Sequence, residues 1–329
     1  MKNSVISLLL VLVIMVSALS TTAMAEEATV KVGYANLSDH SNFCKMVRNS
    51  IVEQCAARGW DLVCVDNNSD AQTAVKNASD LVTLGCDYVI EFNVDESVAP
   101  AIMDIFNEAG IPVIAVDIAH PGAIFFGADN TYAGTLAGET AGKWINENWN
   151  GELEYVVEIT QPDAGEAVAP RVGAFPTGLS NVGITVDEAN IIEIDGKNDS
   201  ATQQSLFAAF LQAHPDATKI AVATIDDTAG NAVYSAAEIA GRADQVVVVS
   251  QNCTADFVEP MYACNGETNW IASIGYFPNR YGEWICPIIE KMIAGEELEE
   301  NYYIDHLAID WSNIKEYYPI DNLPWNNVD

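Results

Sequence analysis

The sequence predicts an α/β fold made of two doubly wound units with parallel sheets. Short apolar runs alternate with helical segments along the chain, which is the rhythm of right-handed βαβ units. The runs are continuously apolar, as expected for strands that helices cover on both faces. The rhythm restarts near residue 132, so the 329-residue chain holds two units of similar size.

In the first unit, two of the helices end at glycines, Gly59 and Gly85, which is a common stop signal. We expect strands at 30–35, 62–65, 88–92 and 113–116, with helices at 43–57, 71–84 and 98–108.

The second unit opens with a helix at 132–147. This helix carries Gly134, Gly138 and Gly142 at four-residue spacing, which we interpret as a surface that lies close against a sheet. Further strands are expected at 155–159, 191–194, 220–224, 246–249 and 270–274, and further helices at 171–179, 202–213, 228–240, 254–263 and 279–293. A last strand is expected near 302–307, before an aromatic tail.

The first 25 residues predict a secretory signal peptide. Lys2 supplies the positive charge, residues 8–16 form an apolar run too short for a membrane span, and Ala23-Met24-Ala25 is a cleavage site. No cysteine sits at the cleavage point, so a lipid anchor is not indicated. We expect a mature chain that begins near Glu26 and works in the periplasm or outside the cell, which excludes cytosolic metabolism and gene regulation.

The charge and composition of the chain limit the classes of molecule that it can bind. The chain carries 47 acidic and 14 basic residues, a formal net charge of −33, and such a surface repels phosphate backbones and anionic lipids. Half of the residues are apolar, which is typical of a globular protein. We expect a monomer that does not bind nucleic acid.

All seven cysteines follow the leader, and their odd number leaves at least one without a partner in the chain. Cys44 and Cys55 are eleven residues apart on one expected helix, about 16 Å, which is beyond disulfide reach. The apolar surroundings favour buried thiols that act as small hydrophobic groups. Cys253 and Cys264 flank one helix, and the sequence leaves their pairing open.

Motifs of common enzymes are absent. The chain has no phosphate-binding loop, no dinucleotide fingerprint, no nucleophile elbow and no zinc-protease motif. Asp66, Asn68 and Asp70 have calcium-loop spacing, but the required glycine and distal glutamate are missing, so we expect a turn and a helix cap there. The sequence therefore predicts no catalytic residue, no metal and no cofactor.

Polar and aromatic residues instead follow the expected strands in both halves. Open α/β sheets bind ligands at the carboxyl ends of their strands. Carboxylates, amides, an arginine and aromatic rings together suit a neutral sugar or polyol. Any one of these residues could instead cap a helix or form a turn, but their recurrence in both halves favours a ligand site. The candidates are Asp39, Phe43, Asn93, Asp117, Arg171, Asp226, Asn252 and Tyr276.

Several runs resemble one family. Gly110-Ile-Pro-Val-Ile-Ala-Val-Asp117, Asp129-Asn-Thr-Tyr-Ala-Gly134 and Phe277-Pro-Asn-Arg-Tyr-Gly282 are similar to runs in periplasmic sugar-binding proteins of the ribose and galactose type, the solute receptors of ABC importers. The resemblance covers roughly residues 30–310. It implies two Rossmann-like lobes joined by a three-strand hinge that close over a sugar.

The resemblance also implies domain bounds and contacts. One lobe would hold residues 26–128 and 277–305, and the other 129–276 and 306–329. The ligand contacts implied are Phe43, Asn93, Asp117, Arg171, Asn252 and Tyr276.

Three positions depart from the family pattern. Ile118 stands where arginine is common, Ile225 replaces an asparagine before Asp226, and Arg171 is single where two arginines are frequent. A charge-assisted hydrogen bond contributes about 1.5–3 kcal/mol, so these losses should change the ligand. Fewer arginines suit a less hydroxylated or non-pyranose ligand.

The resemblance implies a solute-binding protein that captures a sugar or polyol by cleft closure and delivers it to the membrane permease of an ABC importer. Two alternatives remain. One is a sensory module that docks a chemoreceptor or sensor kinase. The other is a secreted glycoside hydrolase with two carboxylates across the cleft, which the absence of catalytic motifs disfavours.

Overall fold

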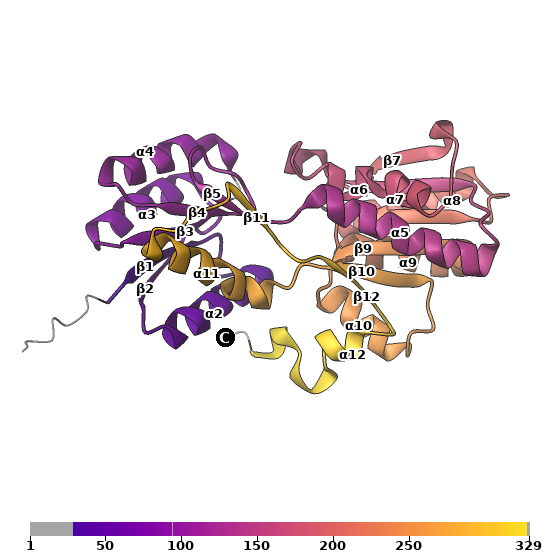
Figure 1. Cartoon of the computed structure of the whole chain (residues 1–329). Helices are drawn as coiled ribbons and strands as arrows, with labels where there is room; N and C mark the ends of the chain where they lie inside the picture. The colour runs from indigo at the N-terminus through magenta and orange to yellow at the C-terminus, as the bar shows by residue number, and fades with distance from the viewer. Residues whose placement is uncertain (1–28, 94, 328–329) are drawn as a thin grey trace, which may run out of the picture.

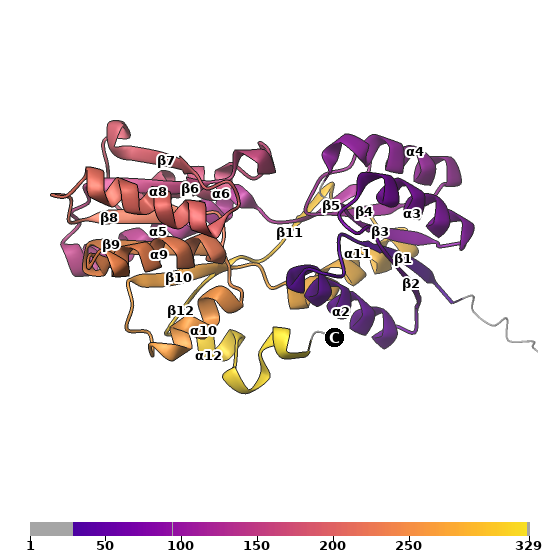
Figure 2. The same ribbon diagram turned by 180° about the vertical axis from the view of Figure 1, so that it is seen from behind.

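The computed structural model describes residues 29–93 and 95–327. It contains two lobes, each a six-stranded sheet with helices on both faces (Figures 1 and 2). The predicted fold class is confirmed. The predicted signal peptide lies outside the described residues.

In the first lobe all strand pairs are parallel, in the order β11-β5-β4-β3-β1-β2. Helices α2 and α11 cover one face of this sheet, and α3 and α4 cover the other. The strands are β1 (Lys31–Asn36), β2 (Asp61–Asp66), β3 (Tyr88–Phe92), β4 (Val113–Val116), β5 (Ile124–Gly127) and β11 (Asn301–Tyr303). The helices are α2 (Asn42–Ala57), α3 (Ala71–Thr83), α4 (Ala99–Ala109) and α11 (Tyr281–Ala294).

The second lobe has the order β12-β10-β9-β8-β6-β7, and only the edge strand β12 runs antiparallel to its neighbour among the described strands. Its strands are β6 (Tyr155–Thr160), β7 (Ile191–Asp195), β8 (Ile220–Thr224), β9 (Val246–Asn252), β10 (Trp270–Gly275) and β12 (Leu307–Asp310). Its helices are α5 (Asn130–Trp149), α6 (Pro170–Gly173), α7 (Phe175–Asn181), α8 (Ser200–Ala213), α9 (Asp227–Ile239), α10 (Ala255–Ala263) and α12 (Ile314–Tyr317).

Two strand predictions need correction. The strand expected near 302–307 is in fact two, because β11 pairs with β5 in the first sheet and β12 pairs with β10 in the second. Strand β5 was not predicted at all. The segment near 302–307 divides because its two ends pair with different sheets. Strand β5 pairs with the preceding strand β4, and its short apolar run, Ile124-Phe125-Phe126, is a local signal that the strand prediction omits.

The glycine stripe of α5 also differs from its interpretation. A Cβ at Gly138 would lie 2.0 Å from Phe175 O, and one at Gly134 would lie 2.4 Å from Pro170 O. The stripe therefore faces the backbones of α6 and α7 rather than a sheet. The single helix expected at 171–179 is these two short helices, which meet at Ala174.

The chain crosses between the lobes three times, as the resemblance implied. The crossings run from β5 into α5, from β10 into α11, and from β11 into β12. A single apolar cluster continues through them and includes buried Phe126, Tyr276, Tyr281 and Ile304. The exact domain boundaries stay a prediction.

The cysteines are less uniform than expected. Five of the seven are buried, but Cys64 is exposed and Cys264 is half-buried. The expectation of buried thiols is therefore wrong for these two. Cys64 lies on β2, an edge strand that has a neighbouring strand on one side only, and this position is consistent with its exposure.

Candidate ligand-binding cleft

Asp117 directly follows β4, with its backbone in the left-handed region at a φ of 61°. Its carboxylate accepts hydrogen bonds from the Tyr281 hydroxyl at 3.3 and 3.4 Å. A Cβ at Gly127 would lie 2.8 Å from Asp117 Oδ1, so the glycine leaves room for this side chain. Burial raises the pKa of Asp117 to about 6, and the charge of Arg171 together with the Tyr281 bond opposes that rise. A carboxyl held this way favours any ligand that donates hydrogen bonds to it.

Arg171 lies on α6 and is oriented by two neighbours. Its Nε donates to Asn130 Oδ1 at 2.9 Å, and its Cζ stands 4.9 Å from the centre of the Tyr276 ring. The Tyr276 hydroxyl in turn donates to Gln251 Oε1 at 3.3 Å. The guanidinium lowers the pKa of both Asp117 and Asp226 against the larger effect of burial. Arg171 is thus the positive centre of an otherwise acidic region.

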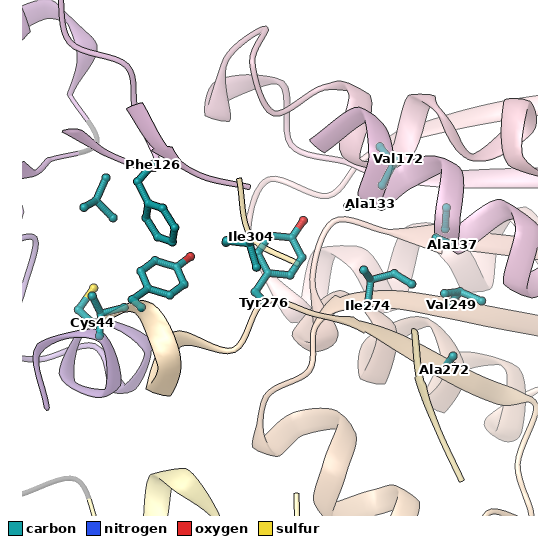
Figure 3. Packing of buried hydrophobic residues seen from close by; sticks show 14 of the residues in the cluster. Cys44, Phe126, Ala133, Ala137, Val172, Val249, Ala272, Ile274, Tyr276 and Ile304 are labelled. Carbon is teal, nitrogen blue, oxygen red and sulfur yellow. The ribbon is translucent and has the colours of Figure 1, made fainter. Parts of the chain in front are cut away.

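These groups come from opposite sides of the hinge. Asp117 and Tyr281 belong to the first lobe, whereas Arg171 and Tyr276 belong to the second. Figure 3 shows Tyr276 beside Ile304 in the region between the lobes, with Phe126 on one side and Val172 on the other. The arrangement places hydrogen-bonding groups of both lobes around one point.

A cavity of about 970 Å³ opens beside this point and is lined by both lobes. Asp117 and Ile118 contribute from the first lobe, and Asn130 and Asp163 from the second. Small-molecule pockets usually measure about 300–1,000 Å³, so this one is at the upper end. Such a volume fits a cleft that is still open.

The other residues predicted in the first lobe are held locally. Asp39 accepts a hydrogen bond from Asn36 Nδ2 at 2.6 Å and pairs with Arg48 at 2.8 Å. Asn93 is bonded to the backbone of Asp95 in both directions, at 3.2 Å each. Phe43 packs edge-on against Tyr281 with ring centres 5.8 Å apart, so it supports the hydroxyl that contacts Asp117.

In the second lobe, Asp226 caps α9 by accepting the Ala229 N–H at 2.8 Å. The helix-cap alternative is therefore realised at this position. Asn252 ends β9 at a φ of 93°, and its carbonyl accepts the Tyr276 N–H at 3.4 Å. The structure thus brings Asp117, Arg171 and Tyr276 together, with Phe43 one ring away. It leaves Asp39 and Asn93 in local contacts, whereas Asp226 caps α9 and also lies within the field of Arg171.

Sequence reasoning missed four supporting residues: Tyr281, Asn130, Gln251 and Gly127. Two of them, Tyr281 and Asn130, lie inside the family-like runs and could have been found there. Gln251 adjoins the predicted Asn252. Gly127 carries no local signal, because its role depends on the approach of Asp117 from the neighbouring strand.

The calcium-like spacing is explained by local structure. Asp70 caps α3 by accepting the Thr73 N–H at 2.8 Å, and Asp66 accepts the Asn68 N–H at 2.8 Å. Within residues 29–93 and 95–327, no group of three or more histidine, cysteine or acidic side chains is placed to hold a metal ion. In the same residues, every helix is too short or too polar to span a bilayer.

Comparisons with known proteins agree on the fold. A family model described as "Periplasmic binding protein domain" matches residues 32–297. The structure resembles a periplasmic solute-binding protein of an ABC transporter from Actinobacillus succinogenes 130z, crystallised with D-allose, at 16% identity and a TM-score of 0.71, covering 88% of this chain and 100% of the other.

Two further similar structures are ABC transporter solute-binding proteins. The one from Mycobacterium smegmatis, with bound glycerol, is 22% identical with a TM-score of 0.70 and coverages of 88% and 96%. The one from Bacillus halodurans C-125, with bound myo-inositol, is 18% identical with a TM-score of 0.69 and coverages of 89% and 98%. No match is found among the curated proteins. Because the family match spans most of the chain, the protein belongs to the periplasmic binding protein domain family.

Proposed function

We propose that this protein captures a small neutral polyhydroxylated solute, a sugar or polyol, by closing its two lobes, and delivers it to the permease of an ABC importer. The observation that carries the proposal is that each lobe brings one pair of side chains to the same region, Asp117 with Tyr281 in one lobe and Arg171 with Tyr276 in the other, close enough for the Arg171 charge to lower the pKa of Asp117. A single ligand contacts both sets only when the lobes approach each other.

The chemistry of the four groups suits adjacent hydroxyls. The Asp117 carboxylate lines the cavity and accepts hydrogen bonds, the Tyr281 hydroxyl and the Arg171 guanidinium donate them, and the buried Tyr276 ring holds Arg171 in place. The similar structures hold D-allose, glycerol and myo-inositol, all of them neutral and rich in hydroxyls. Ile118 lines the cavity where the family often has arginine, which favours a ligand with fewer hydroxyls or a non-pyranose form.

A thermal-shift screen tests the ligand class. The mature chain is heated with neutral sugars and polyols, including D-allose, myo-inositol, glycerol and L-arabinose, and with sugar phosphates as the charged comparison. A ligand that binds only the folded state raises its stability by RT ln(1 + [L]/Kd), about 2.7 kcal/mol at a hundredfold excess over Kd. A screen in which only charged compounds raise the melting temperature would overturn the proposal.

Replacement of Asp117 tests the site. Asp117→Asn keeps the shape of the side chain but removes the charge, so we expect the affinity for the best ligand to fall at least about thirtyfold. Asp216→Asn, on an exposed turn that precedes β8, is the matched control and should bind as the wild type does. Calorimetry measures both, and equal affinities in the two variants would exclude Asp117 as an anchor.

Export remains part of the proposal. We infer a mature chain that begins near Glu26, because Ala23-Met24-Ala25 has the small-residue pattern of a cleavage site and no cysteine lies at the cut. Mass spectrometry of the exported protein reads its first residue. A retained Met1 or an acylated terminus would contradict this inference.

A sensory role is the second candidate. One similar structure is a fructose-binding periplasmic domain of a hybrid two-component system, with 21% identity and a TM-score of 0.65. Uptake of radiolabelled ligand by cells with and without the gene separates the two roles. Uptake that is unchanged by the deletion would favour the sensor.

A further inference from the structure

Two of the seven cysteines lie in contact in the first lobe. The Sγ atoms of Cys55 on α2 and Cys286 on α11 are 4.0 Å apart, although the residues are 231 positions apart in the sequence. Both side chains are completely buried. Among the described residues, no other two cysteine sulfurs make such a contact.

The helices that carry these thiols lie side by side in Figure 1, and contacts before and after the thiols hold their register. Before them, the Gly282 N–H donates to Ser50 Oγ at 2.9 Å, and a Cβ at position 282 would lie 2.4 Å from Ser50 O. After them, Arg58 Nε pairs with Glu290 Oε1 at 2.8 Å. The helices therefore run parallel with their backbones close together.

Close backbones favour a disulfide. The Cα atoms of a disulfide are usually 4.4–6.8 Å apart, a separation reached only where two helices nearly touch. Gly282 permits this approach, because any larger residue would push α11 away from Ser50. The sulfurs, now 4.0 Å apart, must approach to about 2.05 Å to form the bond.

We propose that Cys55 and Cys286 form a disulfide as the chain folds outside the cytoplasm. One cysteine loses its proton and attacks a donor disulfide, either glutathione disulfide or the active-site disulfide of a thiol oxidoreductase, and one donor thiol leaves. The second cysteine then loses its proton and attacks the mixed disulfide, which forms the Cys55–Cys286 bond and releases the second donor thiol. Two electrons thus pass from the cysteines to the donor, in a compartment where disulfides persist.

The bond would join distant parts of the chain. Helix α11 follows the crossing from β10, so the disulfide ties the chain that returns from the second lobe to the first helix of the first lobe. Because it closes a loop of more than 200 residues, it restricts the unfolded chain strongly. The bond adds stability to the first lobe and does not depend on which ligand the cleft binds.

The test uses the mature wild-type chain refolded in two ways, in a glutathione redox buffer and in constant reductant. Each preparation is denatured, alkylated without reduction, digested and analysed by mass spectrometry. We expect a peptide pair joined through Cys55 and Cys286 in the first preparation and five alkylated cysteines beside it. Seven alkylated cysteines, or a bond between other cysteines, would overturn the proposal.

Thermal unfolding gives an independent measurement. We expect the reduced preparation to melt about 5–10 °C below the oxidised one. The double variant Cys55→Ala/Cys286→Ala should melt at the same temperature in both buffers. Cys86→Ala, which removes a buried thiol without a sulfur neighbour, should keep the difference. Equal melting temperatures of the two wild-type preparations would show that no stabilising bond joins α2 and α11.

Discussion

Glu91 is a carboxyl group buried where the fold offers it too few partners. It lies on β3 with no exposed surface, accepts one hydrogen bond from Asn67 Nδ2 at 2.9 Å, and its second oxygen has no partner among the described residues. Burial raises its pKa to about 8, and the Asn67 bond opposes the rise. The folded chain therefore holds a proton at neutral pH that the unfolded chain has lost.

This proton gives a pH-dependent stability. Between pH 4.5 and about 8 the folded state binds more protons at Glu91 than the unfolded state does, so the free energy of unfolding decreases as the pH rises. Glu91→Gln cannot ionise and should be about 1–3 kcal/mol more stable than the wild type near pH 7.5, with little difference at pH 4.5. Urea unfolding at both pH values measures this.

The matched control is Glu238→Gln on the exposed side of α9, which should change neither value. Burial also raises the pKa values of Glu158 and Asp227. Glu91→Gln should therefore reduce the pH dependence of the free energy of unfolding without removing it. A variant whose stability falls with pH as steeply as that of the wild type would show that Glu91 stays ionised in the fold.

At the scale of elements, the packing of α5 on α7 depends on glycines of both helices. Gly138 faces Phe175 O, and a Cβ at Gly178 would lie 1.9 Å from Thr135 O. The two helix backbones therefore touch, and no side chain fits between them. Because α5 is the first element of the second lobe, this contact holds one of the three crossings in place.

Gly138→Ala should separate the two helices. Its Cβ would lie 2.0 Å from a backbone oxygen that has no freedom to move alone, so we expect a loss of about 3 kcal/mol or more. Gly173→Ala is the matched control on neighbouring α6, where a Cβ meets nothing within 4 Å. It should stabilise by up to about 1 kcal/mol, because alanine has less freedom in the unfolded chain. Thermal unfolding measures both variants. Equal melting temperatures would contradict the close packing of α5 on α7.

At the scale of the whole molecule, the three crossings between the lobes form the hinge on which any change in the width of the cleft depends. The three crossings carry Tyr276 and Ile304 in one apolar cluster, and His306 packs edge-on against Tyr276 with ring centres 4.6 Å apart. Burial lowers the pKa of His306 to about 4, so this ring is neutral at physiological pH. His306 is therefore a neutral buried ring at the crossings, and Arg171, whose Cζ lies 4.9 Å from the centre of the Tyr276 ring, is a charged group beside them.

Ligand binding should close the lobes and reduce the radius of gyration measured by small-angle scattering. The reason is that the cavity of about 970 Å³ is larger than a monosaccharide needs and is lined by both lobes. Asp117→Asn is the control: at a ligand concentration about five times the wild-type Kd, the expected loss of about thirtyfold in affinity leaves the variant mostly empty, so it should scatter like the unliganded protein. The ligand is one that calorimetry shows to bind. If the scattering curves with and without it are identical, the pocket is rigid.

The sequence by itself determined the α/β class, the two similar lobes and most of the elements. It could do so because buried parallel strands are continuous apolar runs, such as Val113–Val116, and helix ends carry caps and glycines. It also indicated Asp117 and Tyr276, which directly follow strands, since parallel strands end at one edge of their sheet, and Arg171, which lies downstream of such a strand end. Only the tertiary structure decided that residues 301–303 and 307–310 belong to different sheets, that Asp226 serves as a helix cap, and that Cys55 meets Cys286. Each of these depends on contacts between segments far apart in the chain, or on the direction of a side chain, and local patterns carry neither.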